Sequence, residues 1–372
     1  MTDAIVVGAG IVGAACAWEL ARAGLRVTIC EPSVIGGGAT GAGMGHLAVM
    51  DDSEAQFALT SFSQSLWRDL AEELPPEAEY LPCGSLWIAA DDEEMAEVRR
   101  KHAYYTTRQI PVEILDAHQL AEAEPNLRPG MAGGLLMSAD SVCYPPCAAK
   151  FLIERVIAAG GILRRDGIAA VGEGGATLED GTFLPAGATV VATGTAAARL
   201  IPGLALHPRK GHLIITDRYP GFVNRQLIEL GYLKSAHASD ADSVAFNAQP
   251  RKTGQVLIGS SRQFGVTDSW VEPRMLSDML KRAVEYMPAI AGLSTIRAWT
   301  GFRAATPDHL PLIGRAPGFR NVFLATGHEG LGISTSLATA RLIADEMLER
   351  VSAITRAPYS PTRSSIAPLQ SY

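Results

Sequence analysis

The chain opens with a short apolar run, Ile5-Val6-Val7, whose β-branched residues are typical of a buried parallel strand. Apolar residues then recur at helical spacing over Val12 to Ala23, and Gly24 predicts the end of that helix. A second strand is predicted over Arg26 to Cys30. The segment from Met1 to Glu31 therefore predicts a strand, a helix and a second strand, the unit from which parallel sheets are built.

Three glycines after the first strand have the spacing of a dinucleotide-binding turn. Gly8 permits the tight turn, Gly10 lets a pyrophosphate approach the backbone, and Gly13 lets the helix pack close to the strand. Glu31, at the end of the second strand, is placed to accept hydrogen bonds from the adenosine ribose hydroxyls and would repel a 2′-phosphate. FAD or NAD is therefore expected, and NADP is not.

Two other interpretations of this opening segment are an ordinary glycine-rich turn and a signal peptide. Asp3 and the absence of an early Lys or Arg argue against a signal peptide.

A second glycine-rich stretch follows Glu31, from Pro32 to His46. Such a composition predicts a loop whose backbone lies close to something flat or charged. An NAD enzyme has no evident need for this loop, whereas a flavoprotein must lead its chain past the pyrophosphate and under the isoalloxazine ring. The alternative is a disordered linker, although a linker would normally carry more Ser and charge.

The next part of the chain mixes helices with strands that look antiparallel, which suggests a separate substrate domain. Helices are predicted over Asp52 to Leu74, Asp91 to Gln109, Asp116 to Glu124 and Ala148 to Ala159, and strands over Tyr80 to Ala89 and Gly133 to Met137.

Two further series of strands follow. The first comprises Ile162 to Leu163, Ile168 to Val171 and the run from Ala188 that ends at Gly194, and it is expected to rejoin the nucleotide sheet with Thr193 and Gly194 beside the cofactor. The second comprises Arg209 to Thr216, Leu227 to Leu233, Ser243 to Ala248 and Gln255 to Ser260, with turns at Gly221, Asp240 and Lys252 to Gly254, and it predicts an antiparallel sheet.

One face of that second sheet is polar, because Asn247 and Gln249 alternate with Phe246 and Ala248. The polar face could line a substrate pocket. The more common interpretation of such alternation is a solvated face.

The C-terminal part repeats the strand, glycine turn and helix arrangement. After a helix over Pro273 to Met287, a strand is predicted over Asn321 to Ala325, a turn over Thr326 to Ile333 and a long helix over Ser334 to Arg350. The N-terminus of that helix is a positive dipole end suited to an anion, including the charge on a reduced flavin.

Composition narrows the function further. The 372 residues are 47% hydrophobic and 19% charged, a globular balance that allows two domains, and no run is apolar for long enough to span a membrane. A net charge of −7 offers no attraction for nucleic acid, so a small-molecule or protein partner is expected. The five scattered cysteines lack the spacing of a zinc site, so no metal is expected and a reduced, cytoplasmic protein is the simplest interpretation.

These motifs together resemble the FAD-dependent D-amino-acid oxidase (DAO) superfamily over essentially the whole chain. The resemblance rests on the N-terminal turn, Ala42-Gly43-Met44, Ala192-Thr193-Gly194, Gly301-Phe302-Arg303 with Thr306-Pro307-Asp308, and the turn from Thr326 to Ile333. The last turn most resembles the D-hydroxyproline dehydrogenase and hydrogen cyanide synthase flavin subunits, with glycine oxidase and sarcosine oxidase further away.

The resemblance implies an α/β fold with a Rossmann-type FAD-binding domain and an α+β substrate domain built on an antiparallel sheet. The FAD-binding domain is expected over 1–80, 145–205 and 298–372, and the substrate-binding domain over 81–144 and 206–297. The implied FAD-contacting residues are Gly8, Gly10, Ile11, Val12, Gly13, Glu31, Pro32, Ala39, Thr40, Ala42, Gly43, Met44, Ile168, Thr193, Gly194, Gly301, Arg303, Gly327, His328, Gly330, Leu331, Gly332 and Ile333.

The implied reaction is hydride transfer from the Cα of a small D-amino or cyclic imino acid, such as D-hydroxyproline or D-proline, to flavin N5. Arg303 matches the family's carboxylate-binding arginine, and a guanidinium holds a carboxylate through two parallel hydrogen bonds. The alternative for Arg303 is a structural ion pair. Asn247 and His46 complete the candidate catalytic set, although His46, His309 and His328 are interpreted first as hydrogen-bonding or packing residues.

The sequence departs from two branches of the family. Phe246-Asn247 stands where glycine oxidases carry a carboxylate-binding tyrosine, so Asn247 would be a weaker substitute. None of the cysteines lies beyond Cys147, so the covalent flavin link of sarcosine oxidases is absent and the FAD is expected to be non-covalent.

Other functions remain open. The enzyme could be an oxidase of glycine or an N-substituted glycine, the flavin subunit of a larger complex such as hydrogen cyanide synthase, or an NAD-dependent Rossmann dehydrogenase. A dehydrogenase would need partner subunits with iron–sulfur or flavin relays, since this chain lacks clustered cysteines. A cytoplasmic location is expected. The alternative, for a subunit of such a complex, is peripheral attachment to the inner membrane.

Overall fold

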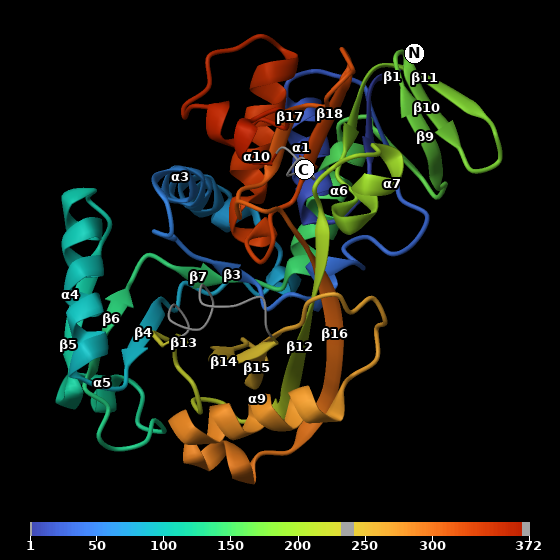
Figure 1. Cartoon of the computed structure of the whole chain (residues 1–372). Helices are drawn as coiled ribbons and strands as arrows, with labels where there is room; N and C mark the ends of the chain where they lie inside the picture. The colour runs from blue at the N-terminus through green and yellow to red at the C-terminus, as the bar shows by residue number, and fades with distance from the viewer. Residues whose placement is uncertain (1, 232–241, 367–372) are drawn as a thin grey trace, which may run out of the picture. The chain divides into compact units, whose positions relative to one another are not determined.

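The computed structural model describes residues 2–231 and 242–366 (Figure 1). Within these residues the chain divides into two compact units. Unit 1 comprises 2–78, 144–208 and 302–366, and unit 2 comprises the described parts of 79–143 and 209–301. The end of the strand predicted over Leu227 to Leu233 and the turn predicted at Asp240 lie outside the described residues.

Unit 1 is built on a sheet with β1 (Thr2–Val7) near its centre. β1 pairs in parallel with β2 (Val27–Cys30) on one side and with β11 (Phe183–Val191) on the other. The order along the sheet is β17-β18-β11-β1-β2-β8. The other strands of this sheet are β8 (Ile162–Arg164), β17 (Leu312–Arg315) and β18 (Val322–Thr326), with β9 (Ile168–Gly172) and β10 (Gly175–Leu178) off this path.

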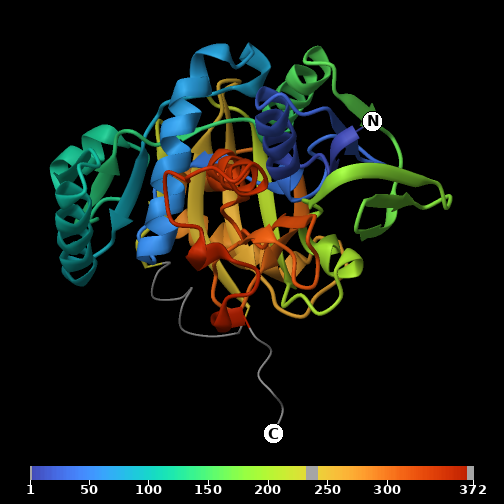
Figure 2. The ribbon, with the colours of Figure 1, turned by 90° about the horizontal axis from the view of Figure 1, so that it is seen from above.

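Helices pack on this sheet because its central strands are buried on both faces. The helices of unit 1 are α1 (Ile11–Arg22), α2 (Ala39–Ala42), α3 (Glu54–Leu70), α6 (Pro145–Ala158), α7 (Ala197–Leu200) and α10 (Gly332–Met347). Figure 2 shows α10 in red beside the blue helices α1 and α3, both of which it contacts. Ile5, Val7, Val191 and Leu324 are at most 4% exposed and share one core cluster, which explains their unbroken apolar runs.

Unit 2 is built on a second sheet with the order β16-β12-β15-β14-β13-β4-β6-β5. β13 and β4 run parallel, whereas β12–β15, β15–β14, β14–β13, β4–β6 and β6–β5 are antiparallel. The strands are β4 (Ser85–Ala89), β5 (Val112–Asp116), β6 (Gly133–Met137), β12 (His207–Arg218), β13 (Gln226–Glu229), β14 (Ser243–Pro250), β15 (Gln255–Arg262) and β16 (Thr295–Ala305), and two-residue strands lie at β3 (His46–Leu47) in unit 1 and β7 (Ser141–Val142) in unit 2.

The core of unit 2 lies between this sheet and α9 (Pro273–Tyr286). The rings of Phe246 on β14 and Tyr286 on α9 are stacked with their centroids 4.8 Å apart. The other helices of this unit are α4 (Asp92–Thr107) and α5 (Ala117–Ala123). Asp116 and Gln119 form a capping box that fixes the start of α5.

Several elements differ from the sequence prediction for identifiable reasons. The stretch from Pro32 to His46 is not loop throughout, because Ala39–Ala42 form α2 and His46 begins β3. α6 begins at Pro145 instead of Ala148, since proline is tolerated in the first turn of a helix. The sequence pattern does not predict β5, β16 or β17. β16 carries Gly301 and Arg303, and β17 is the next strand along the chain.

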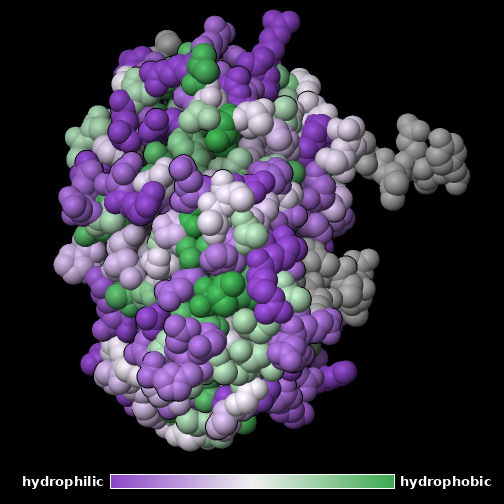
Figure 3. Space-filling model, turned by 90° about the vertical axis from the view of Figure 1, so that its left-hand side faces the viewer, coloured by the Kyte–Doolittle hydropathy of each residue, from purple (hydrophilic) through white to green (hydrophobic). Residues whose placement is uncertain are grey.

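The face shown in Figure 3 mixes hydrophilic residues with small hydrophobic patches. In the described part of the chain, no helix combines the length and the apolar character needed to cross a membrane.

Candidate functional site

The turn after β1 leaves no room for side chains. Gly8 has φ +99°, and a Cβ built on it would lie 2.7 Å from the carbonyl oxygen of Ala192. A Cβ on Gly13 would lie only 2.0 Å from the carbonyl oxygen of Gly8. The register of β1 with β11, in which Val7 faces Val191, brings Ala192 and Thr193 to this turn. The predicted proximity of the first turn to Thr193 is therefore present in unit 1.

Glu31 ties this turn to the chain that follows β2. Its Oε2 accepts a hydrogen bond from the amide of Ala9 at 3.0 Å, and its Oε1 accepts one from the amide of Ser33 at 2.9 Å. The amide of Gly36 also donates to the carbonyl oxygen of Ala9 at 2.9 Å. A carboxylate has about four lone-pair positions, so two acceptor sites remain for ribose hydroxyls.

The segment from Pro32 to His46 packs against the starts of two helices. The hydroxyl of Thr40 accepts a hydrogen bond from the amide of Ile11 at 3.0 Å. A Cβ on Gly43 would lie 2.9 Å from Cδ1 of Ile333, at the start of α10. The carbonyl oxygen of His46 accepts a hydrogen bond from the hydroxyl of Ser334 at 2.8 Å. These contacts identify a positioned loop, so the disordered-linker interpretation is wrong.

The second glycine turn lies between β18 and α10. The hydroxyl of Thr326 donates to the carbonyl oxygen of Gly194 at 2.9 Å, and Gly327 takes φ +77°. A Cβ on Gly332 would lie 3.8 Å from Cγ2 of Val12, so the N-termini of α1 and α10 are neighbours. The predicted segments around Gly8, Thr40, Gly194 and Gly332 therefore converge at one place in unit 1.

This place fits a dinucleotide. The N-caps of α1 and α10 are Gly10 and Leu331, and neither provides a side-chain cap, so backbone N–H groups at both helix starts suit an anion. The hydroxyl of Thr193 is buried and has no hydrogen-bond partner among the described residues. A bound pyrophosphate or ribityl chain would provide partners for groups of this kind.

Arg303 lies beside the second glycine turn. It is near the end of β16 and is partly buried, and a Cβ on Gly330 would lie 3.8 Å from its Nε. The amide of Glu329 donates to the carbonyl oxygen of Ala304 at 2.8 Å, which joins the two backbones. The guanidinium is thus held next to the turn that precedes α10.

Asn247 lies on β14 in unit 2. It is 8% exposed, and its Nδ2 donates to the hydroxyl of Ser260 at 3.4 Å. Gln249 on the same face is 1% exposed. The solvated-face interpretation is therefore wrong, because these polar side chains are buried.

The comparisons with known proteins identify the family. The family described as "DAO: FAD dependent oxidoreductase" matches residues 3–346. The chain belongs to this family. It is therefore an FAD-dependent amino-acid oxidoreductase, as the sequence predicted, and the expected fold class is confirmed.

The DAO-family chain is similar to named relatives over nearly its whole length. It is 30% identical to a glycine oxidase of Pseudomonas aeruginosa, covering 96% of this chain and 98% of the relative. It is 25% identical to the hydrogen cyanide synthase subunit HcnC of that species, covering 97% and 96%. The solved structure of glycine oxidase from Geobacillus kaustophilus matches with a TM-score of 0.87 at 28% identity, covering 97% of this chain and 98% of that one.

Two of the three histidines predicted near the cofactor, His328 and His46, differ in their surroundings in this enzyme. His328 is buried, its Nε2 lies 3.0 Å from the hydroxyl of Thr339, and burial lowers its pKa to about 3. Its imidazole is therefore neutral at ordinary pH, in agreement with a packing and hydrogen-bonding role. His46 is partly buried on β3.

The other residues predicted to contact FAD differ in their burial and in the elements that carry them. Met44 is buried, whereas Pro32 and Ala39 are exposed. Ile168 begins β9 and packs in the core cluster with Val7. Gly301 lies on β16, two residues before Arg303. Ala42 is the last residue of α2, and Gly43 is its C-cap.

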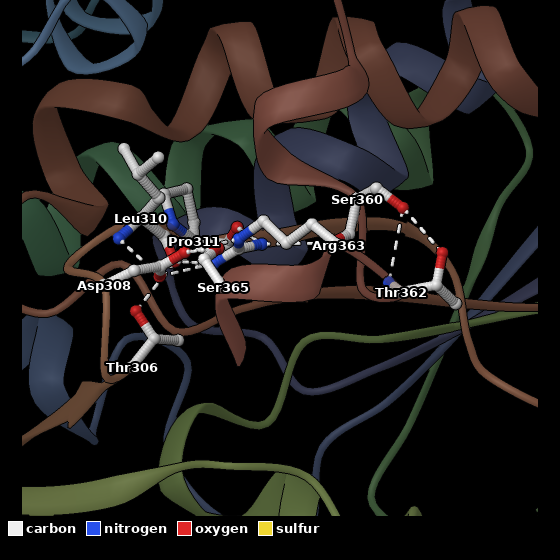
Figure 4. A network of polar contacts seen from close by, with 8 residues as sticks. All are labelled: Thr306, Asp308, Leu310, Pro311, Ser360, Thr362, Arg363 and Ser365. Atoms are coloured by element: carbon white, nitrogen blue, oxygen red, sulfur yellow. Dashed lines mark hydrogen bonds and ion pairs between the residues drawn. The ribbon is translucent and has the colours of Figure 1, made fainter. Parts of the chain in front are cut away.

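One contact that the sequence pattern does not predict joins Asp308 to Arg363 (Figure 4). Asp308 belongs to the motif Thr306-Pro307-Asp308, whereas Arg363 belongs to none of the motifs above. The two residues are 55 positions apart, and a single arginine near the C-terminus carries no periodic or spacing signal.

Proposed function

We propose that this enzyme oxidises a small D-amino or cyclic imino acid of the D-hydroxyproline or D-proline type at its Cα. The observation that carries the proposal is the position of Arg303 beside the turn before α10, where the fingerprint turn and the glycine-rich loop also meet. When bound, FAD supplies the acceptor for the hydride that leaves the substrate.

Arg303 is proposed to hold the substrate carboxylate. Its guanidinium stays charged at any working pH and can donate two parallel hydrogen bonds, which fixes the orientation of the carboxylate as well as its place. The rate would then come mainly from positioning, since an amine in its neutral form needs no protein base to release a hydride from the neighbouring carbon.

Unit 1 is proposed to hold the FAD without a covalent bond. Its fingerprint residues Gly8, Gly10 and Gly13 would face the pyrophosphate and Glu31 the ribose, with the turn from Gly327 to Ile333 at the flavin end. The five cysteines all lie at or before Cys147, and none forms a disulfide among the described residues. Burial raises the pKa values of Cys16, Cys30 and Cys143, which makes these three thiols poor nucleophiles.

Asn247 and His46 are proposed as the other two residues that contact the substrate. Phe246 cannot take the part of the tyrosine found in glycine oxidases, because its side chain is fully buried against Tyr286. The amide of Asn247 would then offer a weaker, neutral contact in place of the phenol.

A second candidate is oxidation of glycine or an N-substituted glycine with production of hydrogen peroxide. The names of the Pseudomonas aeruginosa and Geobacillus kaustophilus relatives favour it. The similarity to a hydrogen cyanide synthase subunit supports a further variant, in which the chain passes electrons to partner subunits of a complex.

An anaerobic visible spectrum of the purified holoenzyme separates these candidates. The protein would be titrated with D-proline, cis-4-hydroxy-D-proline, glycine and sarcosine, and then opened to air. Bleaching of the flavin absorbance by the D-prolines with slow recovery in air is expected for a D-imino-acid dehydrogenase. Bleaching by glycine or sarcosine with rapid recovery would overturn the proposal in favour of an oxidase.

A further inference from the structure

The connection between β16 and β17 is fastened to the C-terminal segment by one arginine. Nε and Nη2 of Arg363 donate to Oδ2 and Oδ1 of Asp308 at 2.7 and 2.8 Å, a bidentate pair (Figure 4). The side chains of Arg363 and Asp308 are only 8% and 16% exposed. Such a pair is largely shielded from solvent, so its geometry is better fixed than that of a surface ion pair.

Arg363 uses all of its donors in this place. Nη1 donates to the carbonyl oxygens of Pro311 and Ser360 at 2.9 and 3.1 Å, and Nη2 also donates to that of Leu310 at 2.6 Å. A guanidinium has five N–H groups, and these contacts account for every one of them. No other side chain type can reach a carboxylate and three carbonyl oxygens at once.

Asp308 is held from several directions as well. The hydroxyl of Ser365 donates to its Oδ2, and the amide of Leu310 donates to its Oδ1 at 3.2 Å. Burial opposes ionisation of this carboxyl, but the hydrogen bonds from Arg363 and Ser365 prevail and lower its pKa to about 2. Residues 306–311, which we call the clasped loop, are therefore held in place by hydrogen bonds from Arg363 and Ser365 in the segment that follows α10.

The clasped loop in turn supports the second glycine turn. A Cβ on Gly327 would lie 2.8 Å from Cγ2 of Thr306, so the side chain of Thr306 packs directly against the backbone of Gly327. Nδ1 of His309 lies 2.9 Å from Oε2 of Glu329. Both of these residues take left-handed backbone conformations, with φ +59° and +52°. Such conformations persist only where the surroundings hold them.

We propose that Arg363 is a positioning residue for the flavin end of the site: it fixes the clasped loop, and the clasped loop fixes the turn at 327–330 beside Arg303. The C-terminal segment thereby sets the affinity for FAD, although it lies outside the fingerprint and the glycine-rich loop. This inference rests on the proposed placement of the flavin at that turn.

The test compares Arg363→Ala and Arg363→Lys with the wild-type enzyme. Lysine keeps the charge but cannot form the fork, so it separates geometry from charge. Arg350→Ala is the matched control, since Arg350 is an exposed arginine shortly after the end of α10. Two quantities are measured: the FAD dissociation constant by flavin fluorescence, and amide hydrogen exchange of peptides covering 305–312, 327–331 and 359–366.

We expect Arg363→Ala to raise the FAD dissociation constant at least tenfold and to speed exchange in all three peptides. Arg363→Lys should raise the constant at least threefold, and Arg350→Ala should leave both quantities unchanged. If Arg363→Ala does not yield folded protein, Arg363→Lys decides the question by the same measurements. Faster exchange confined to 359–366, with an unchanged FAD dissociation constant, would show a merely structural tail and overturn the proposal.

The result is independent of the substrate. Neither measurement requires turnover, so a finding that glycine rather than a D-imino acid bleaches the flavin would reject the proposed function and leave this inference standing. Faster exchange at 305–312 and 327–331 with unchanged FAD binding would instead show that the order of this turn does not set the affinity for FAD, and would reject the inference while leaving the proposed substrate class untouched.

Discussion

The carbonyl oxygen of Gly8 lies 2.0 Å from the position that a Cβ on Gly13 would occupy. The two glycines bracket the start of α1, and their close approach brings the helix onto β1. No real Cβ tolerates such a distance from backbone, so a side chain at residue 13 must displace either the turn or the helix. The turn and the helix start are the parts of unit 1 that fit a pyrophosphate.

Replacing Gly13 with Ala should therefore release FAD. We expect the ratio of flavin to protein absorbance in the purified protein to fall at least tenfold, because the N–H groups at the start of α1 would be displaced. Gly172→Ala is the matched control, since a Cβ on that residue of β9 would meet nothing within 4 Å. A Gly13→Ala protein that retains stoichiometric FAD would contradict the placement of the cofactor.

Replacing Glu31 with Gln tests the second part of the same site. The amide group of glutamine replaces one acceptor by a donor, which would face the N–H of Ala9 or of Ser33. We expect the FAD dissociation constant, measured by fluorescence titration, to rise about tenfold through the loss of a charge-assisted hydrogen bond. Glu77→Gln, on an exposed turn of the same unit, should bind FAD as the wild type does.

Replacing Arg303 with Leu should weaken substrate binding and leave FAD bound. Removing one partner of a hydrogen-bonded charge pair costs about 2–5 kcal/mol, so we expect kcat/KM to fall by about 30-fold or more. Arg303→Lys should lose less, because it keeps the charge without the fork. Arg297→Leu on the same strand is the control, since Arg297 is exposed. Unchanged kinetics for Arg303→Leu would rule out the carboxylate clamp.

Glu124 in unit 2 predicts a pH dependence of stability. Its side chain is fully buried, and both carboxylate oxygens accept a hydrogen bond from the amide of Asn224 at 3.2 Å, with Nη1 of Arg225 at 3.9 Å. Burial outweighs these contacts and raises its pKa from 4.5 to about 7. The folded state therefore binds the proton more tightly than the unfolded state does.

The sign of the effect follows from this order of pKa values. The stabilisation by protonated Glu124 is complete below pH 4.5 and is lost as the pH rises towards and beyond 7, a change of about 3 kcal/mol. Thermal unfolding at pH 5, 6, 7 and 8 should show that Glu124→Gln removes this decline relative to the wild type. Glu122→Gln, whose parent side chain is 69% exposed on α5, should keep it. Parallel curves for Glu124→Gln and the wild type would mean that Glu124 is ionised throughout.

The local elements of the nucleotide-binding half could be predicted from the sequence because their causes are local. The run Ile5-Val6-Val7 is apolar on both faces, and a strand with that pattern must be buried in a parallel sheet. The spacing of Gly8, Gly10 and Gly13 likewise predicts a turn that has no room for side chains. The structure shows this crowding at Gly8 and Gly13, where a Cβ would collide with backbone oxygens. The family and its cofactor followed from these motifs in order.

The tertiary structure decided what depends on distant pairs. Alternation at Asn247 and Gln249 indicates two different faces of a strand but cannot say whether the polar one is exposed, and these two side chains are only 8% and 1% exposed in the structure. α9 packs on the opposite face, against Phe246. The ion pair between Asp308 and Arg363 joins residues 55 positions apart, and no periodicity of the sequence relates them. The sequence pattern determines which local backbone conformations are possible. The burial of side chains and the pairing of distant residues are decided only when the chain folds into its tertiary structure.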